Sequence, residues 1–411
     1  MDPRSDRPRP ATRRPGPDRP RHPDRPHDVV VLGATGFAGR LTAEYLARHA
    51  PEGCRWALAG RSPEKLARVR DELAAIDPAC ADLPLLRADV TDERSLRELA
   101  ERSRVIATTV GPYVLHGDGL VAACAASGTD YLDLTGEPEF VDVSYVRHHA
   151  TAADTGARLV HAAGFDSVPH DLGAWFTVRR LPEGAAIRLS GYVRASATFS
   201  GGTFHSLVTA VSRPRQNVTA ARARREREPR DASGRHVRAR LGVPHRAPFG
   251  GWAVPLPTLD PQIVARSARA DARYGPDFTY SHYVALPHLR TAVGGMAGVG
   301  AITVAAQLPP ARRAMLSKVP AGNGPSAERR ARSWFSVTFV GEGGGEQART
   351  RVSGGDPGYD ETAKMLAESA LCLAFDDLPA TSGQVTTATA MGGALVDRLR
   401  DAGLAFEVLD D

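Results

Sequence analysis

VVVLGATGFAG, residues 29–39 of a chain of 411, sets the architecture of the first third of the protein. Four consecutive apolar residues predict a buried strand, and the glycines after them lead into a helix. Gly33 suits the tight turn, Gly36 lets the backbone approach a pyrophosphate, and Gly39 lets helix and strand pack closely. Because N–H groups and the dipole at a helix N-terminus attract phosphate, the pattern indicates a dinucleotide site.

Strands and helices alternate from residue 28 to about residue 163. Apolar runs predict strands at 29–33, 55–59, 84–88, 104–109, 131–134 and 158–162. Helical patterns lie between them, at 37–49, 63–76, 94–101, 120–127 and 140–154. In the first helix Phe37, Leu41 and Tyr45 recur every four residues, which predicts one buried face. Regular alternation implies parallel strands joined by right-handed crossovers, so residues 28–165 are predicted to form a doubly wound Rossmann domain of the α/β class.

The second half has a different pattern, which predicts a mixed α+β substrate domain. Strand-like runs occur at 187–195, 333–340 and 349–352, and long irregular connections separate them. Helices are expected at 361–375 and 388–402, and a last strand at 406–409. No internal repeat is visible.

Charge is unevenly distributed along the chain. Residues 1–27 hold eight Arg, four Asp and eight Pro, supply +4 of the net charge of +5, and predict a disordered tail. Residues 213–246 hold eleven Arg against three acidic residues, which fits either a solvated loop or a basic docking surface. Residues 291–311 carry no charge, and a core helix or an apolar segment facing the substrate is favoured over a transmembrane helix.

The end of the second predicted strand indicates which nucleotide binds. An NAD site usually has an Asp or Glu there, whereas this strand ends Ala59-Gly60-Arg61-Ser62. Arg61 can pair with a 2′-phosphate and Ser62 can donate to it, so NADP(H) is the predicted cofactor. Asp89, after the third strand, is expected beside the adenine, or alternatively as a cap of the next turn.

Two later loops are expected at the nicotinamide end, because ligands of open α/β sheets bind outside the carboxyl ends of the strands. One is VGPY at 110–113 and the other is GFDSVPHD at 164–171. Ser167 also suits a helix N-cap, with Pro169 in the first turn. The predicted cofactor-binding residues are Gly33, Thr35, Gly36, Phe37, Gly39, Arg61, Ser62, Asp89, Gly111 and Pro112.

Several motifs together resemble one known family. GATGFAG, AGRS, VGPY, YLDLTGE and GFDSVPHDLG are similar to the saccharopine dehydrogenase-like superfamily, and more narrowly to its trans-acting enoyl reductase branch. The likeness continues through residues 333–335, 354–365 and 388–399. It implies an NADP-binding Rossmann domain, a discontinuous substrate domain at 166–384, and a C-terminal segment, 385–411, that returns to the first domain.

The reaction expected from this resemblance is reduction of an α,β-unsaturated acyl thioester in lipid, glycolipid or polyketide synthesis. Hydride would go to the β-carbon and a proton to the α-carbon, with donors aimed at the enolate oxygen. Tyr113, Ser167 and His170 are the catalytic candidates, and His116 is a weaker one. The alternatives are a saccharopine-type amino-acid dehydrogenase and an NADP-sensing or lipid-associated binding protein without turnover.

The expected partners follow from the same reading. The substrate is an acyl or polyketide-type small molecule, which an acidic carrier protein could present, and the basic stretch could contact an anionic membrane. Nucleic acid and a metal ion are not expected. Four widely spaced cysteines fit a reducing cytosol, so the predicted location is cytoplasmic, with association at the plasma membrane as a further expectation.

Overall fold

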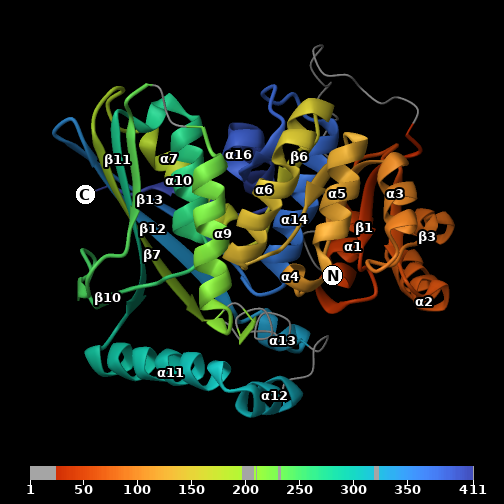
Figure 1. Ribbon diagram of the computed structural model, residues 1–411, viewed down its shortest axis with the longest axis horizontal. Coiled ribbons are helices and arrows are strands. Elements are labelled where there is room, and N and C mark those ends of the chain that lie inside the picture. Colours follow the sequence, from red (N-terminus) through yellow and green to blue (C-terminus); the bar gives the residue numbers. More distant parts are fainter. Residues whose placement is uncertain (1–24, 197–207, 210, 230–232, 319–323, 411) are drawn as a thin grey trace, which may run out of the picture.

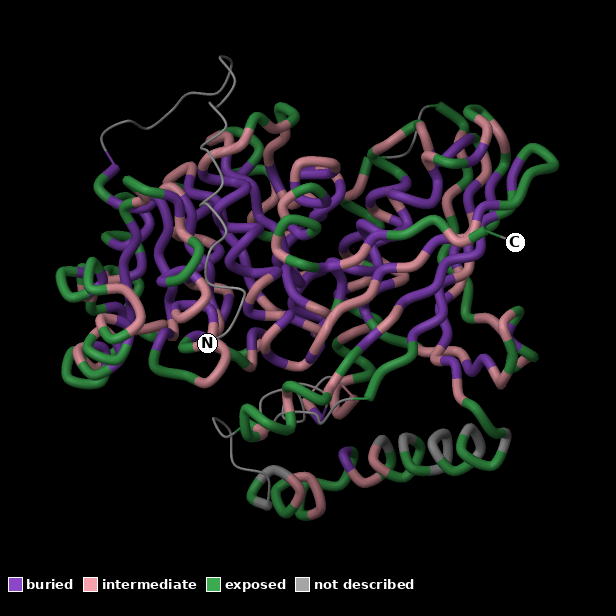
Figure 2. Tube along the Cα trace, turned by 180° about the vertical axis from the view of Figure 1, so that it is seen from behind, coloured by how far each residue is buried: buried purple, intermediate pink, exposed green. Residues whose placement is uncertain are grey.

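The protein consists of two sheets side by side with helices packed around and between them (Figure 1). The computed structural model describes residues 25–196, 208–209, 211–229, 233–318 and 324–410. Within those residues the core is continuous from the first sheet into the second, as the buried segments in Figure 2 show.

The first sheet is parallel throughout and has the order β14-β6-β5-β4-β1-β2-β3. Its strands are β1 (His27–Leu32), β2 (Trp56–Gly60), β3 (Leu85–Arg87), β4 (Ser103–Thr108), β5 (Asp130–Leu132), β6 (Arg158–Val160) and β14 (Gly383–Val385). All six strands predicted for this domain are present, and the doubly wound architecture is confirmed.

Helices cover both faces of this sheet. One face carries α1 (Phe37–His49), α2 (Pro63–Ala74) and α14 (Asp360–Phe375). The other carries α3 (Glu93–Glu101), α5 (Asp118–Ser127) and α6 (Pro138–Thr155), and the short α4 (Tyr113–His116) precedes α5. The five helices expected in this domain are therefore α1, α2, α3, α5 and α6.

The buried face of α1 differs from the predicted one. Thr42, Ala43 and Leu46 are fully buried, whereas Phe37, Leu41 and Tyr45 are only half-buried. The reason is that the buried residues face the sheet, while the predicted stripe lies on the side of α1 that is next to α14. There the Tyr45 hydroxyl donates to Glu368 at 2.7 Å.

The second sheet is mixed, as the α+β expectation requires. Its order is β15-β13-β12-β7-β11-β10-β9, with β8 also paired to β11. The strands are β7 (Ile187–Ser196), β8 (His236–Arg240), β9 (His245–Arg246), β10 (Trp252–Pro255), β11 (Asp277–Leu286), β12 (Trp334–Gly343), β13 (Glu346–Gly354) and β15 (Ala405–Val408). The helices α7 (Val168–Val178) and α10 (Asp260–Ala270) pack on it and face the first sheet.

The C-terminal part of the chain alternates between the two sheets. The helix α14 and strand β14 belong to the first sheet, so the return begins before residue 385. The last strand, β15, instead pairs antiparallel with β13 of the second sheet. The helix expected at 388–402 is divided into α15 (Thr387–Ala390) and α16 (Gly392–Asp401), because Gly392 has φ +46°.

The disordered tail was predicted to extend to residue 27, but residues 25–27 belong to the described fold. Residues 1–24 lie outside the described residues, but Arg25 is buried and anchored. Its Nη1 donates to the Ser103 carbonyl at 2.5 Å and to the Thr129 hydroxyl at 2.6 Å. The ordered chain therefore begins before Asp28, and His27 is the first residue of β1.

The arginine-rich stretch at 213–246 is mainly a helix and two strands. The helix α9 (Pro214–Arg227) packs along α6, and Ala220 and Arg224 form its buried side. Arg235 donates to the last carbonyls of α10, including that of Ala268 at 2.8 Å. A solvated loop is therefore the wrong description for the part of this stretch that the structure describes, because packing and capping use several of its arginines.

The uncharged segment at 291–311 lies in α11 (Leu289–Gln307) and the start of α12 (Pro309–Lys318). The helix extends away from the body of the protein (Figure 1). Val304 is 67% exposed and Leu308 is 55% exposed, so the expectation of a core helix is wrong. Among the described helices, none has the length and apolar character needed to cross a membrane.

Candidate functional site

The loop between β1 and α1 has the geometry expected of a phosphate-binding turn. Gly33 has φ +90°, which a residue with a side chain rarely adopts. A Cβ at Gly39 would lie 2.2 Å from the Gly33 carbonyl oxygen, so this glycine is required for close packing. Thr35 and Gly36 are exposed, and Gly36 is the N-cap of α1, which leaves the first N–H groups of the helix open to a ligand.

The end of β2 presents a cation beside this loop. The Arg61 side chain is exposed and forms no ion pair with any described residue. The Ser62 hydroxyl accepts from Lys65 N at 3.3 Å, as the N-cap of α2, and donates to Glu64 Oε2 at 2.8 Å. Arg61 is thus available to a 2′-phosphate without any rearrangement. Ser62 can donate to the phosphate only after its hydroxyl has given up its hydrogen bond to Glu64.

Asp89 has the second of the two roles expected for it. Its Oδ1 accepts from Thr91 N at 2.9 Å and from the Thr91 hydroxyl at 2.8 Å, which closes the turn before α3. These hydrogen bonds lower the pKa of Asp89, and the nearby Arg61 lowers it further. Asp89 is therefore a turn residue that lies near the predicted adenine site.

Phe37 joins the nucleotide loop to the second half of the chain. Its ring packs edge-on against Tyr359, with 4.7 Å between centroids, and the Arg330 guanidinium lies 5.5 Å from the centroid of the Phe37 ring.

The loop after β4 is expected at the nicotinamide end of the cofactor. There the Gly111–Pro112 peptide is cis, and Gly111 is exposed.

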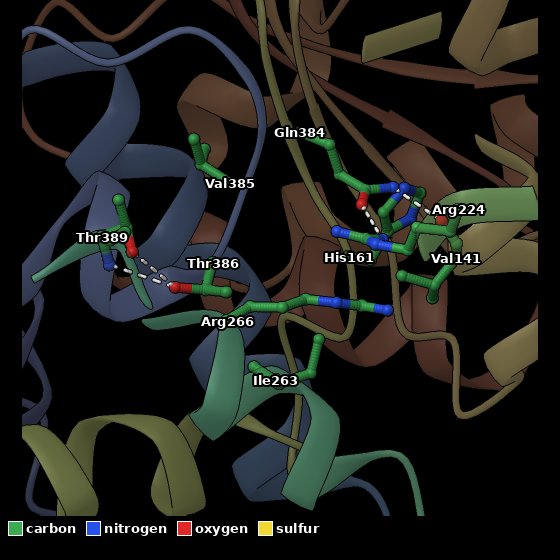
Figure 3. A pocket seen from close by; sticks show the side chains of 10 residues that line it. Val141, His161, Arg224, Ile263, Arg266, Gln384, Val385, Thr386 and Thr389 are labelled. Carbon is green, nitrogen blue, oxygen red and sulfur yellow. Dashed lines mark hydrogen bonds between the residues drawn. The ribbon is translucent and has the colours of Figure 1, made fainter. Parts of the chain in front are cut away.

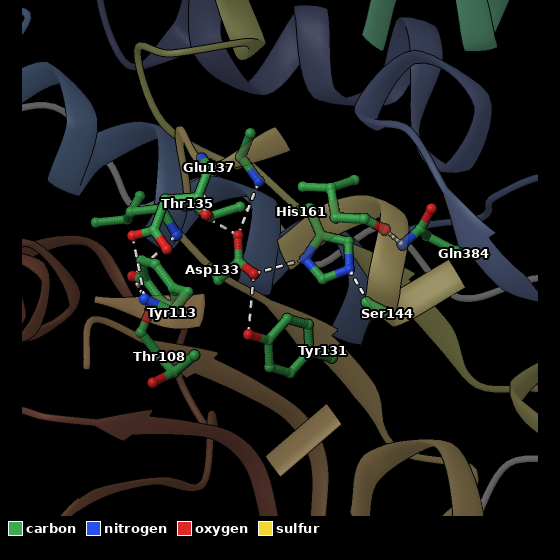
Figure 4. Close-up of polar contacts among 12 residues, drawn as sticks. Thr108, Tyr113, Tyr131, Asp133, Thr135, Glu137, Ser144, His161 and Gln384 are labelled. Carbon is green, nitrogen blue, oxygen red and sulfur yellow. Dashed lines mark hydrogen bonds and ion pairs between the residues drawn. The ribbon is translucent and has the colours of Figure 1, made fainter. Parts of the chain in front are cut away.

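Tyr113 is held by the ends of β4 and β5 (Figure 4). The buried hydroxyl donates to the Thr108 carbonyl at 3.1 Å and accepts from Leu134 N at 3.2 Å. Burial raises the pKa of Tyr113 well above its usual value. This geometry favours a structural role for Tyr113 over the catalytic role that its sequence position suggested.

The YLDLTGE motif forms a polar network behind these loops (Figure 4). Asp133 Oδ2 accepts from the Tyr131 hydroxyl at 2.9 Å and lies 2.6 Å from His161 Nδ1. The carboxylate of Glu137 accepts from Tyr113 N at 3.1 Å and from Val114 N at 2.7 Å. The motif therefore fixes the loops after β4, β5 and β6 relative to one another.

A cluster of four titratable side chains lies where the loop after β6 meets the second sheet. His170 Nδ1 is 3.0 Å from Asp260 Oδ1, and His282 Nε2 is 3.7 Å from Asp260 Oδ2. Asp166 lies beside Gly136, is exposed, and is close enough to Asp260 and His170 to interact with their charges. Burial would raise the pKa of Asp260, but its interactions with His170 hold it below its usual value.

The electrostatics of this cluster raise the pKa of Asp166. Dense surrounding protein and the Asp260 carboxylate raise the pKa of Asp166 to about 7. Burial lowers the pKa of His282 to about 3, so that ring is neutral, and its Nδ1 lies 2.9 Å from the Tyr280 hydroxyl. The ligand atoms of His170, Asp260 and His282 also lie within 4.8 Å of one another, a spacing that a metal ion could use.

The remaining predicted residues are near this cluster or at its margin. Ser167 is at the N-cap position of α7, but its buried hydroxyl makes no capping bond and has no partner among the described residues. His116 is half-buried at the end of α4. Asp166 lies within the GFDSVPHDLG motif, but the sequence predicted no role for it. Asp260 and His282 carried no sequence signal, because only folding brings them to His170.

Comparison with known proteins identifies the first domain. Residues 29–162 match the family model described as the saccharopine dehydrogenase NADP binding domain. Among solved structures, apo saccharopine dehydrogenase (L-Glu forming) from Saccharomyces cerevisiae is similar in fold, with a TM-score of 0.53 and 12% identity over 93% of this chain and 99% of that one. The predicted cofactor, NADP(H), agrees with the family model.

Curated relatives cover nearly the whole chain. A trans-acting enoyl reductase of Mycobacterium ulcerans is 37% identical over 92% of this chain and 97% of its own length. A trans-acting enoyl reductase of Mycobacterium tuberculosis is 38% identical over 93% of this chain and 98% of its own. These matches include both sheets and the site between them. The chain is therefore an NADP-dependent oxidoreductase that belongs to the trans-acting enoyl reductase family of the saccharopine dehydrogenase-like superfamily.

Proposed function

We propose that the protein reduces the carbon–carbon double bond of an enoyl thioester with NADPH. The observation that carries this proposal is the match, over more than nine-tenths of the chain, to proteins named trans-acting enoyl reductases. The neighbouring saccharopine dehydrogenase supports the fold alone, since only 12% of its residues are identical.

The residues present fit the cofactor. Gly36 would place a Cβ within 4 Å of only one heavy atom, the Gly33 carbonyl oxygen, so the backbone there is open to a pyrophosphate. The exposed Arg61 side chain is available for the 2′-phosphate. When bound, NADPH supplies the hydride that adds to the β-carbon of the substrate.

Asp166 is the proton donor in this proposal. Its pKa of about 7 leaves much of it protonated at neutral pH, and it is exposed at the carboxyl end of β6. A general acid works best when its pKa is near the operating pH. After hydride addition, the α-carbon accepts the proton of Asp166, which becomes a carboxylate and is then reprotonated by solvent.

His170 and Ser167 support that step. His170 is buried against Asp260, where it lowers the pKa of that carboxyl and so keeps it charged. The Ser167 hydroxyl has no partner among the described residues, so it is the donor proposed for the enolate oxygen.

The assay follows NADPH oxidation with a short-chain enoyl thioester, and in parallel with a keto acid plus an amine. The proposal expects turnover with the thioester alone. Turnover only with the keto acid and amine would favour a saccharopine-type reaction. Tight NADPH binding with no turnover on either would favour a binding protein.

The substrate is further proposed to arrive on an acidic carrier protein. Arg215, Arg222 and Arg225 are exposed on α9, where complementary charge would speed the encounter. Changing these three to Ser should slow turnover of a carrier-bound thioester and reduce its salt dependence, while free thioester is turned over normally. Equal effects on both substrates would rule out docking at α9. Contact with an anionic membrane stays a prediction.

A further inference from the structure

A cavity with both apolar and charged side chains in its lining lies beyond the carboxyl ends of β6 and β14 (Figure 3). It has a volume of about 80 Å³ and lies between α6, α9, α10 and the start of α15. One water needs roughly 10–15 Å³ of such space, so the cavity has room for a group of several heavy atoms. The reaction proposed above uses none of its residues.

Two buried arginines reach this cavity from different helices. Arg224 of α9 is 7% exposed and Arg266 of α10 is 12% exposed. Arg266 Nη2 donates to Asp142 Oδ1 at 2.5 Å, and Arg224 Nε donates to Glu228 at 2.5 Å. Arg224 also lies 3.5 Å from Asp142 Oδ1, so it has two carboxylate partners, whereas Arg266 has only Asp142 among the described residues.

One guanidinium nitrogen has no acceptor. Arg266 Nη1 is fully buried and has no hydrogen-bond partner among the described residues. Leaving a buried charged donor unpaired is costly in a folded protein. Burial, followed by the nearby Arg224, lowers the pKa of Arg266 to about 9, although Asp142 and Glu228 act in the opposite direction.

A hydroxyl donor completes the polar lining. Thr389 Oγ1 accepts from the Thr386 hydroxyl at 2.9 Å, which leaves the proton of Thr389 for another acceptor. The amide of Gln384 is already used at both ends, since it accepts from Arg224 at 2.6 Å and donates to the Val141 carbonyl at 2.8 Å. Among the described residues, Arg266 Nη1 and the Thr389 hydroxyl are therefore donors that remain available to a ligand.

We propose that this cavity binds a compact oxyanion, a phosphate or a carboxylate, through Arg266 and Thr389. It is separate from the phosphate-binding turn after β1, because β6 is three strands from β1 in the sheet. Three strand spacings amount to about 14 Å. The anion comes either from solution or from a charged group on the substrate, and binding from solution does not depend on the proposed reaction.

The first test measures binding of inorganic phosphate and of acetate to the protein saturated with NADP, by calorimetry and thermal melting at fixed ionic strength. Arg266→Gln and Thr389→Val should each weaken binding about tenfold or more, as expected for loss of a charge-assisted hydrogen bond. Arg94→Gln is the matched control, because Arg94 is 88% exposed and pairs with Glu98 on α3. Thr389→Val keeps every charge, so it remains informative if Arg266→Gln does not fold.

The second test identifies the source of the anion. KM is compared for an enoyl pantetheine thioester with and without a terminal phosphate. A higher KM in Thr389→Val for the phosphorylated form alone would place the anion on the substrate, and unchanged KM values with weaker phosphate binding would place it in solution. Equal phosphate and acetate binding in wild type, Arg266→Gln and Thr389→Val, or no binding at all, would overturn the proposal and leave a cavity that holds only water.

Discussion

Two glycines of the nucleotide loop should separate cofactor binding from folding. A Cβ at Gly36 would meet only the Gly33 carbonyl oxygen, at 3.3 Å, and φ −81° with ψ 166° is a conformation that valine adopts. Gly36→Val should therefore change the free energy of unfolding by less than about 1 kcal/mol. A Cβ at Gly39 would lie 2.2 Å from the same oxygen, so Gly39→Ala should cost about 1–3 kcal/mol or more.

For NADPH affinity per folded molecule, in contrast, Gly36→Val should be the more damaging of the two variants. Valine at position 36 fills the space through which the loop meets the pyrophosphate. Losing two charge-assisted hydrogen bonds, at about 1.5–3 kcal/mol each, predicts at least about a hundredfold weaker NADPH binding.

Thermal melts monitored by circular dichroism report folding, and titration of NADPH fluorescence reports affinity. The reasoning fails if folded Gly36→Val binds NADPH normally. It also fails if Gly39→Ala melts at the wild-type temperature.

Three further changes test the other assignments. Arg61→Ala should weaken NADPH binding about tenfold or more and leave NADH binding unchanged, by fluorescence titration, because only NADPH carries the 2′-phosphate; equal losses for both would refute the assignment. Asp166→Asn should lower kcat about 10²–10⁴-fold. It should also abolish the decline in wild-type kcat as pH rises through about 7, where the acid form is lost; an unchanged pH–rate profile would exclude Asp166. Tyr113→Phe should keep kcat but lower stability by about 0.5–1.5 kcal/mol, because its hydroxyl joins Thr108 to Leu134; a large loss of kcat in a stable variant would restore its catalytic role.

The Rossmann half was predictable because its signals are local. Glycine spacing, strand length and helix periodicity each act within about twenty residues, and β1, α1 and β2 follow directly from them. The break between α15 and α16 falls inside the single helix that was expected at 388–402. Gly392, with φ +46°, follows Met391 at this break, and glycine is a poor helix former, so the residue type marked a break that the expected helix ignored.

The candidate site was less predictable because it depends on contacts between distant residues. His170 lies in a recognisable motif, but Asp260, at the start of α10, and His282, within β11, belong to no motif. Arg224 illustrates the same limit within a single helix. A run of arginines suggests a solvated surface, and only the packing of α9 on α6 shows that Arg224 is buried.

The late position of β14 has a consequence for how the chain matures on the ribosome. The strand that completes one edge of the first sheet ends at Val385, and α14, which covers part of that sheet, begins at Asp360. A nascent chain that has released only its first 165 residues lacks both, so part of one face and one edge of its sheet stay open to water and to other chains. Such contacts between distant residues slow folding. The N-terminal half should therefore need chaperone protection until synthesis is nearly finished, and it should be poorly soluble when expressed alone.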